Sequence, residues 1–574
     1  MKIMLSNAPW HIIDWNNKTG LLGCRAGSRW PHMREYRGNM VSRYQPFPFF
    51  LATASAMLKQ KVYKVVIHDS IALGETYSQF YEYIADVKPD LVFFEVSTPS
   101  INNDLEIINK IRRIIPKAWI VVGGLHEPVN STAFLYNQNN IDFTIYGEYE
   151  HPLLMLCEAL ISGRNLSEVP NLVYREGKEI CKTKRENLLP MEDFPWPDRN
   201  SLPDVYYDGC GGMMGLELQV HASRGCPYRC NFCVLPQIIY FGTYRMRKPQ
   251  DVIDEIKYNF EKKPYTHFYF DDDTINVSKS HFMELCKLIK ENGLDKYPWS
   301  CMARGDLMDD EMLEAMKESG CYSIKYGIES FNQDVLKQSG KELDLAKNIK
   351  NIKKTEDLGI RVHLTYCLGM LGDTLETVKD TIRKSLELRA DSRQYSIATP
   401  FVGSKLWHEY KKRGWLNTED CRGYDANHEA AVDRENLPAD ELVRLKREAD
   451  YLNKQQLRQM VTSQFLTDEF YMNFTEIISS YKKILITDTS RHSFVEHFAE
   501  IMRESGHEVA ICTNIHMIGD GRILQGKYDA IVVPVQTFTL VGVENIIKNV
   551  QNLSNHVIVI FAHAKIVELY EEDE

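Results

Sequence analysis

Three cysteines at C-x-x-x-C-x-x-C spacing, Cys226, Cys230 and Cys233, constrain this chain more than any other feature of its sequence. A disulfide framework needs paired thiols, and a structural zinc site needs four ligands, usually as two C-x-x-C pairs. Three thiolates within eight residues instead suit a [4Fe–4S] cluster held at three corners, with its fourth iron open to a small ligand. A zinc knuckle or three unrelated thiols is the alternative.

Composition narrows the class of protein. The 574 residues carry a net charge of −11, with 44% hydrophobic and 26% charged residues, as in ordinary globular proteins. No basic block indicates a nucleic-acid partner, and no apolar run approaches the 20 residues of a membrane span. Thirteen cysteines, mostly scattered singly, favour reduced thiols and a cytoplasmic location.

Residues 1–150 alternate short apolar runs with helical patterns. We expect strands at 2–5, 64–68, 91–96, 119–122 and 143–145, with helices at 48–60, 75–86 and 103–115. This alternation predicts an open parallel sheet, which binds ligands beyond the carboxyl ends of its strands. The candidate ligand-binding residues at these ends are Asn7, Ala8, Asp69, Ser97, Thr98, Gly123, Gly124, His126, Gly147 and Glu148.

The loops Gly123-Gly-Leu-His126 and Gly147-Glu-Tyr-Glu150 make this region similar to the cobalamin-binding domain that precedes many radical S-adenosylmethionine (SAM) enzymes. The resemblance implies that the ten residues contact cobalamin. His68 precedes Asp69 within a strand, so we expect cobalt without a histidine lower ligand. The loop at 20–32 either caps cobalamin, faces the substrate or is an ordinary surface loop.

Residues 216–400 again alternate strands and helices, with strands expected at 216–222, 267–270, 299–303, 323–327, 361–368 and 394–398. Together with Phe232 before the last cysteine, they resemble the partial (β/α)6 barrel of the radical SAM superfamily. That resemblance implies SAM contacts from three groups of residues: Asp271, Asp272 and Asp273 near its amino group, Arg304 at its carboxylate, and Gly327, Glu329 and Ser330 near its ribose. Alternatively, the three aspartates cap a helix and Glu329 forms a buried ion pair.

The fold class is therefore α/β in several units. We expect a Rossmann-like cobalamin-binding domain at 1–160, a linker with a hairpin tip at 161–215, and a radical SAM partial barrel at 216–405. A helical extension at 406–475 and a small α/β domain of unknown role at 476–574 complete the chain.

The resemblance implies a cobalamin-dependent radical SAM methyltransferase, which acts on an unactivated carbon or a phosphinate phosphorus through a 5′-deoxyadenosyl radical and methylcobalamin. The alternatives are an oxidoreductase, cyclase or rearrangement enzyme with the same cofactors, or a non-catalytic sensor. A methylthiotransferase would carry three more cluster cysteines near its N-terminus, whereas residues 1–160 hold only Cys24 and Cys157. The expected partners are a small-molecule or peptide substrate and an external electron donor such as flavodoxin or ferredoxin. The sequence identifies no catalytic side chain.

Overall fold

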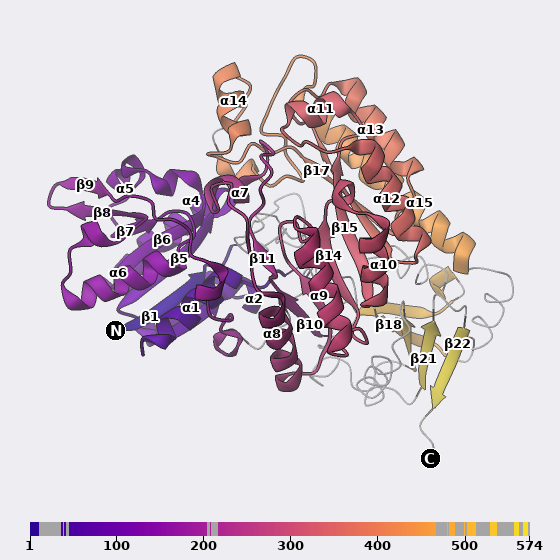
Figure 1. The fold of residues 1–574 in the computed structure, drawn as a ribbon, viewed down its shortest axis with the longest axis horizontal. Coiled ribbons are helices and arrows are strands. Elements are labelled where there is room, and N and C mark those ends of the chain that lie inside the picture. The colour runs from indigo at the N-terminus through magenta and orange to yellow at the C-terminus, as the bar shows by residue number, and fades with distance from the viewer. Residues whose placement is uncertain are drawn as a thin grey trace.

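The computed structural model describes residues 1–10, 36–37, 40–41, 45–203, 207, 216–418 and 420–465, and short segments between 479 and 571. Three larger sheets follow one another along the chain (Figure 1). The loop at 20–32 and much of the α/β domain expected at 476–574 lie outside the described residues.

The N-terminal sheet has seven strands in the order β4-β1-β5-β6-β7-β8-β9. The first five strands of this order pair in parallel, as predicted, and the last two add an antiparallel hairpin. The hairpin turns at Gly177, within the expected tip, but it extends the sheet into the stretch predicted as a linker. The strands are β4 (Lys64–Asp69), β1 (Lys2–Asn7), β5 (Leu91–Ser97), β6 (Trp119–Leu125), β7 (Phe143–Ile145), β8 (Leu172–Glu176) and β9 (Glu179–Lys182).

Helices cover both faces of this sheet because its central strands are apolar on both sides. β5 is buried throughout its length, which is typical of a parallel strand between two helical layers. Helices α1 (Phe49–Gln60) and α6 (Glu150–Ser162) share one apolar core with the sheet, and α3 (Tyr77–Val87) and α4 (Ile101–Ile114) share the other.

The second sheet contains six parallel strands in the order β10-β13-β14-β15-β16-β17. Among the described residues its outer strands do not pair with each other, so the barrel is partial, as predicted. The strands are β10 (Leu216–Val220), β13 (Tyr265–Phe270), β14 (Trp299–Ala303), β15 (Cys321–Glu329), β16 (Arg361–Leu368) and β17 (Ser392–Ile397). The helices between successive strands include α8 (Pro249–Lys262), α9 (Lys279–Glu291), α10 (Asp310–Glu318), α12 (Leu345–Asp357) and α13 (Leu375–Glu387).

Alternation along the barrel strands separates core residues from chemistry-bearing residues. On β15, Ile324, Tyr326 and Ile328 are fully buried in the core shared with the helices. The residues that alternate with them, Lys325, Gly327 and Glu329, are only partly buried and face the other side of the sheet. Gly327 and Glu329 of the predicted SAM site therefore lie on the side of β15 away from the helices.

The region after the barrel is largely helical, as expected. Helix α14 (Lys405–Arg413) follows the last barrel strand, and α15 (Ala439–Phe465) contributes Leu442, Leu445 and Ala449 to the barrel core. Within the described part of the chain, no helix is long and apolar enough to cross a membrane.

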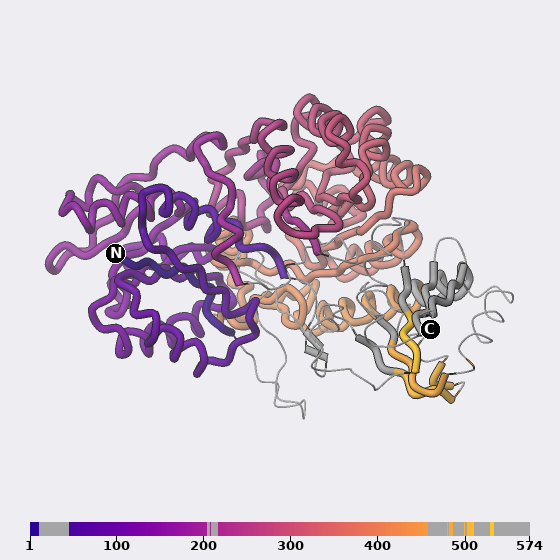
Figure 2. Tube along the Cα trace, turned by 90° about the horizontal axis from the view of Figure 1, so that it is seen from below, coloured from indigo at the N-terminus to yellow at the C-terminus, as the bar shows by residue number. Residues whose placement is uncertain are grey.

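The third sheet has the order β19-β18-β20-β21-β22 and lies on the side of the barrel away from the N-terminal sheet (Figures 1 and 2). Its first four strands pair in parallel and β22 is antiparallel. The strands are β18 (Lys483–Thr487), β19 (Glu508–Cys512), β20 (Ala530–Val535), β21 (His556–Phe561) and β22 (Ile566–Glu571). The described strands thus form one mostly parallel sheet, and the α/β character expected for 476–574 stays a prediction.

Candidate functional site

The cysteine loop joins β11 (Ser223–Arg224) to the short helix α7 (Val234–Ile238). Gly225, which precedes the first cysteine, has φ +87°, and a Cβ atom there would overlap the Thr243 carbonyl oxygen. Gln237 Nε2 donates to the carbonyl oxygens of Cys230 (3.1 Å) and Cys233 (2.6 Å). The loop therefore has a defined turn at its entrance and a side-chain clamp at its exit.

All three cysteines are free thiols, and burial raises the pKa of each. For Cys230, the positive charges of Lys341 and Arg304 partly oppose that rise in pKa. Buried thiols of this kind become ligands when a metal displaces their protons. Three free thiols on one short loop fit a cluster, in which each thiolate binds a different iron.

The predicted acidic triplet after β13 braces the entrance to this loop. Asp272 accepts hydrogen bonds from the Ala222 backbone N–H (3.1 Å) and from the Ser223 hydroxyl, and Asp273 accepts from the Gly225 N–H (3.0 Å). Asp271 Oδ2 lies 4.0 Å from His221 Nε2. None of the three is the N-cap of the following helix α9, whose cap is Ser278.

Arg304 follows β14, and its guanidinium fork already has a partner within the chain. Its Nε and Nη2 donate to Asp306 at 3.0 and 2.7 Å. The central carbon of its guanidinium group lies 3.8 Å from the ring centre of Tyr228, a residue of the cysteine loop. The sequence predicted that this fork holds the SAM carboxylate. The structure instead pairs it with Asp306, and Arg304 supports the loop through Tyr228.

Glu329, at the end of β15, has φ +68°, which is uncommon for a residue other than glycine and clusters at functional sites. Its Oε1 lies 2.7 Å from Lys341 Nζ, and that ammonium also donates to the Gly327 carbonyl oxygen (2.8 Å). A Cβ at position 327 would lie 2.5 Å from Glu329 Oε1. The alternative of a buried ion pair for Glu329 is thus observed, and its partner Lys341 was indicated by no sequence pattern.

The remaining barrel candidates have structural partners. Ser330 Oγ lies 3.2 Å from Thr381 Oγ1, on helix α13. Phe232 is partly buried against two apolar clusters, one with Leu336 and the other with Leu406.

The candidates at the carboxyl edge of the N-terminal sheet lie together in a buried region. Asp69 caps the short helix α2 (Ser70–Leu73), and Thr98 Oγ1 lies 3.3 Å from His126 Nδ1. Burial lowers the pKa of His126 to about 3, so this imidazole is neutral. Asn7, Ala8 and Ser97 are also buried at this edge.

His68 is engaged elsewhere. Its Nε2 lies 2.7 Å from Glu75 Oε2, and its ring stacks on Tyr83 at 3.7 Å between ring centres. These contacts fix the orientation of the ring, and the expectation that cobalt has no histidine lower ligand stays a prediction.

Close packing within the protein explains why glycine occupies three positions at this edge. Gly124 has φ +127°, and a Cβ there would overlap the carbonyl oxygen of Val96 on the neighbouring strand. A Cβ at Gly123 would lie 3.0 Å from the Ile145 carbonyl oxygen, and one at Gly147 would lie 2.8 Å from the Phe241 ring. The sequence related these glycines to a bulky ligand, but close packing of the chain already requires them.

Glu148 also differs from its predicted environment. Its Oε1 accepts from Arg224 (2.9 Å) and Arg245 (2.7 Å), which belong to the barrel unit. The carboxylate expected to contact cobalamin thus forms ion pairs between the two units.

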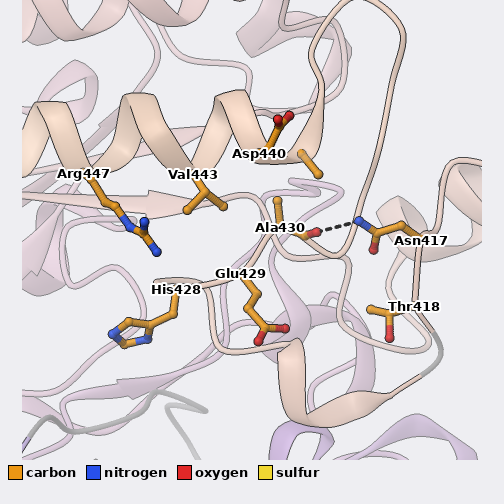
Figure 3. Close-up of a pocket in the computed structure, with 9 residues that line it drawn as sticks. Asn417, Thr418, His428, Glu429, Ala430, Asp440, Val443 and Arg447 are labelled. Atoms are coloured by element: carbon orange, nitrogen blue, oxygen red, sulfur yellow. Dashed lines mark hydrogen bonds between the residues drawn. The ribbon is translucent and has the colours of Figure 1, made fainter. Parts of the chain in front are cut away.

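A separate hollow of about 460 Å³ lies beside α15 (Figure 3). Figure 3 shows His428 and Glu429 on a loop across from Val443 and Arg447 on the helix. Its lining includes none of the three cysteines and none of the predicted cofactor contacts.

Comparisons with known proteins identify both units. Residues 220–384 match the radical SAM superfamily, and residues 40–156 match the B12 binding domain. Both units of the chain are therefore similar to those of the cobalamin-binding radical SAM enzymes. Members of this class bind cobalamin, SAM and a [4Fe–4S] cluster, so the cofactor set expected from the sequence is confirmed.

Two relatives and one solved structure show the extent of the similarity. An uncharacterised methyltransferase of Pyrococcus horikoshii is 28% identical over 379 residues, which span 66% of this chain and 81% of that protein. The anaerobic magnesium-protoporphyrin IX monomethyl ester cyclase of Cereibacter sphaeroides is 27% identical over 58% of this chain, but only 54% of the cyclase is matched. The radical SAM methyltransferase TsrM from Kitasatospora setae, solved with cobalamin and a [4Fe–4S] cluster, shares the fold at a TM-score of 0.55 and 18% identity, over 72% of this chain and 75% of TsrM.

Proposed function

We propose that this enzyme is a cobalamin-dependent radical SAM methyltransferase. The observation that carries the proposal is the presence in one chain of a B12 binding domain and a radical SAM domain with three free thiols on one loop. The methyltransferase of P. horikoshii is similar to this chain over four fifths of its own length, which favours methyl transfer as the outcome.

In this proposal Cys226, Cys230 and Cys233 hold the cluster. Hydrogen bonds from Gln237 and to Asp273 fix the backbone on either side of the thiols, so little reorganisation accompanies iron binding. When bound, the cluster supplies the electron that cleaves SAM, and cobalamin carries the methyl group. An external electron donor such as flavodoxin or ferredoxin would reduce the cluster.

SAM would lie against the end of β15. Lys341 supplies a buried ammonium close to Cys230, where the carboxylate of SAM needs a positive partner. Glu329 holds that ammonium in place, and its left-handed backbone turns the chain at Ser330. Lys341 is thus a second candidate, beside Arg304, for the positive partner of the SAM carboxylate, and Arg304 also contacts Tyr228 in the cysteine loop.

Cobalamin would lie over the carboxyl edge of the N-terminal sheet, near Asn7, Ala8, Ser97, Thr98 and His126. Open parallel sheets bind ligands at this edge. We expect cobalt without a lower ligand from His68, because this residue precedes Asp69 within strand β4.

The test uses SAM with a deuterated methyl group. Reduced, reconstituted enzyme with its substrate should give a product carrying three deuterium atoms, with one S-adenosylhomocysteine and one 5′-deoxyadenosine per product. Cys230→Ala should form no 5′-deoxyadenosine. A product without deuterium would overturn the proposal.

The second candidate function is cyclisation or oxidation with the same cofactors. The similarity to the C. sphaeroides cyclase favours it, although the match covers only about half of that protein. This alternative predicts that 5′-deoxyadenosine forms in proportion to product, whereas S-adenosylhomocysteine does not.

A further inference from the structure

Four buried charged side chains join the cysteine loop to the N-terminal unit. Arg224 Nη1 donates to Glu148 Oε1 (2.9 Å) and to Glu150 Oε1 (2.7 Å), and Arg245 Nη2 donates to Glu148 Oε1 (2.7 Å). The exposed fraction of these side chains is between 0% and 10%. We call these four residues the interdomain ion cluster.

The two arginines lie opposite each other: Arg224 directly precedes the cysteine loop, and Arg245 lies on the strand that follows α7. Arg224 on β11 pairs with Arg245 on the antiparallel strand β12 (Arg245–Met246), and only Gly225 separates Arg224 from Cys226. Like charges directly across a strand pair are destabilising. This ribbon therefore depends on carboxylates from another part of the chain.

Those carboxylates come from the carboxyl edge of the N-terminal sheet. Glu148 and Glu150 follow β7, and Glu150 begins α6. The positive end of the helix dipole and the two guanidinium groups both stabilise negative charge at this point. The ion cluster thus connects the predicted cobalamin edge to the first residue of the predicted iron–sulfur loop.

Further contacts hold Arg224 in the N-terminal unit. Its Nη2 donates to Thr53 Oγ1 on α1 (3.2 Å), and its guanidinium lies 4.7 Å from the ring centre of Phe194 and 5.2 Å from that of Phe50. At the other end of the loop, Val234, Leu235 and Ile238 of α7 belong to the apolar core of the N-terminal unit.

Stability alone is a weak reason for this arrangement. Burying a charged group carries a desolvation penalty, and apolar residues of similar size often serve stability equally well. A guanidinium held by two carboxylates, a hydroxyl and two aromatic rings instead permits one orientation, because its donors form a rigid fork.

We propose that Arg224, Glu148 and Glu150 are positioning residues that fix the cysteine loop to the carboxyl edge of the N-terminal sheet. They set the relation between the iron–sulfur site and the cobalamin site. The identity of the two ligands rests on the proposed function, whereas the mechanical link does not.

Hydrogen–deuterium exchange of the full-length, cofactor-free protein tests the link. Glu148→Gln removes the carboxylate shared by both arginines and should speed amide exchange at 223–226 at least tenfold. The matched control is Asp142→Asn, which breaks the ion pair between Asp142 and Arg112. Asp142 directly precedes β7 and Glu148 follows the same strand, so both variants remove a carboxylate near one strand. This control should leave exchange at 223–226 within twofold of wild type. Should Glu148→Gln not fold, Arg224→Lys keeps the charge, loses the fork and gives the same comparison.

Adding hydroxocobalamin separates positioning from a merely structural role. In wild type the ligand should slow exchange at 223–226, and in Glu148→Gln this response should disappear. Equal exchange in Glu148→Gln and Asp142→Asn would overturn the inference. It would also fall if Glu148→Gln weakened hydroxocobalamin binding tenfold without changing exchange in the free protein, because Glu148 would then be a direct contact. A wild type that binds no hydroxocobalamin refutes the proposed function, while exchange in the free protein still decides the positioning role.

Discussion

Replacing Gly225 by alanine should prevent correct assembly of the cysteine loop. Gly225 directly precedes Cys226 and has φ +87°, and an added Cβ would overlap the Thr243 carbonyl oxygen. That oxygen belongs to the backbone of the return segment, so it cannot move aside as the end of a flexible side chain would. Relief requires a shift of the cysteine loop itself.

Two contributions set the magnitude. A left-handed backbone conformation costs an L-residue about 1–2 kcal/mol. Overpacking against fixed atoms adds about 1–3 kcal/mol. Gly225→Ala should therefore cost about 2–5 kcal/mol if the loop keeps its native geometry. A shift of the loop would recover a large part of that free energy. We therefore expect the loop of the variant to move, which displaces the three thiols from their native positions.

The assay is iron and sulfide content after anaerobic reconstitution, with Gly163→Ala as the matched control. Gly163 ends α6 with φ +70°, but no atom lies within 4 Å of its added Cβ, so its alanine variant carries the backbone term alone. We expect about four irons per chain in wild type and Gly163→Ala, and fewer than half as many in Gly225→Ala. Equal iron content and equal thermal stability in the two alanine variants would refute the steric argument.

Three further perturbations have defined outcomes. His126→Asn should make the protein less sensitive to acid. The pKa of His126 is about 3 in the folded protein and about 6.5 in the unfolded chain. Below about pH 6.5 the free energy of unfolding of wild type therefore falls by up to about 1.4 kcal/mol per pH unit. Thermal melts at pH 7.5 and 5.0 check this, and an identical loss in both proteins would argue against a neutral buried imidazole. Lys341→Met should weaken SAM binding to the reconstituted enzyme at least tenfold in equilibrium dialysis, whereas Lys279→Met, which breaks an exposed ion pair, should not. Unchanged affinity in Lys341→Met would remove Lys341 from the SAM site. Cys157→Ala should lower the melting temperature but keep full iron content, because Cys157 is buried in the N-terminal core; iron loss there would contradict the three-cysteine assignment.

Local patterns in the sequence were sufficient to predict the five parallel strands of the first sheet and the six strands of the barrel. The buried run Leu91–Ser97 and the alternation on Arg361–Leu368 predict one strand each, because burial on two faces or one face leaves a distinct pattern. The cysteine loop could also be predicted from the sequence, because its three expected ligands lie within eight residues. The hairpin β8–β9 was recognised as a turn, but its addition to the sheet depends on pairing with β7, which local sequence does not encode.

Partners of charged side chains were harder to predict. Glu148 and Arg224 are 76 residues apart, and Arg245 is 97 residues from Glu148, so only the packing of two units brings them together. Asp272 braces Ala222 because β10 and β13 lie in parallel register, with Val220 beside Phe270. Motif resemblance indicated the correct strand ends, but it did not reveal which side chains already have partners within the chain.

The most direct test of the proposed chemistry is the yield of SAM products from reduced, reconstituted enzyme without substrate, with and without hydroxocobalamin. We expect 5′-deoxyadenosine in both cases and S-adenosylhomocysteine only with hydroxocobalamin. Cys230→Ala should lose 5′-deoxyadenosine and keep the cobalamin-dependent S-adenosylhomocysteine. If 5′-deoxyadenosine persisted without the three cysteines, or S-adenosylhomocysteine formed equally without hydroxocobalamin, the assignment of the two cofactor sites would be contradicted.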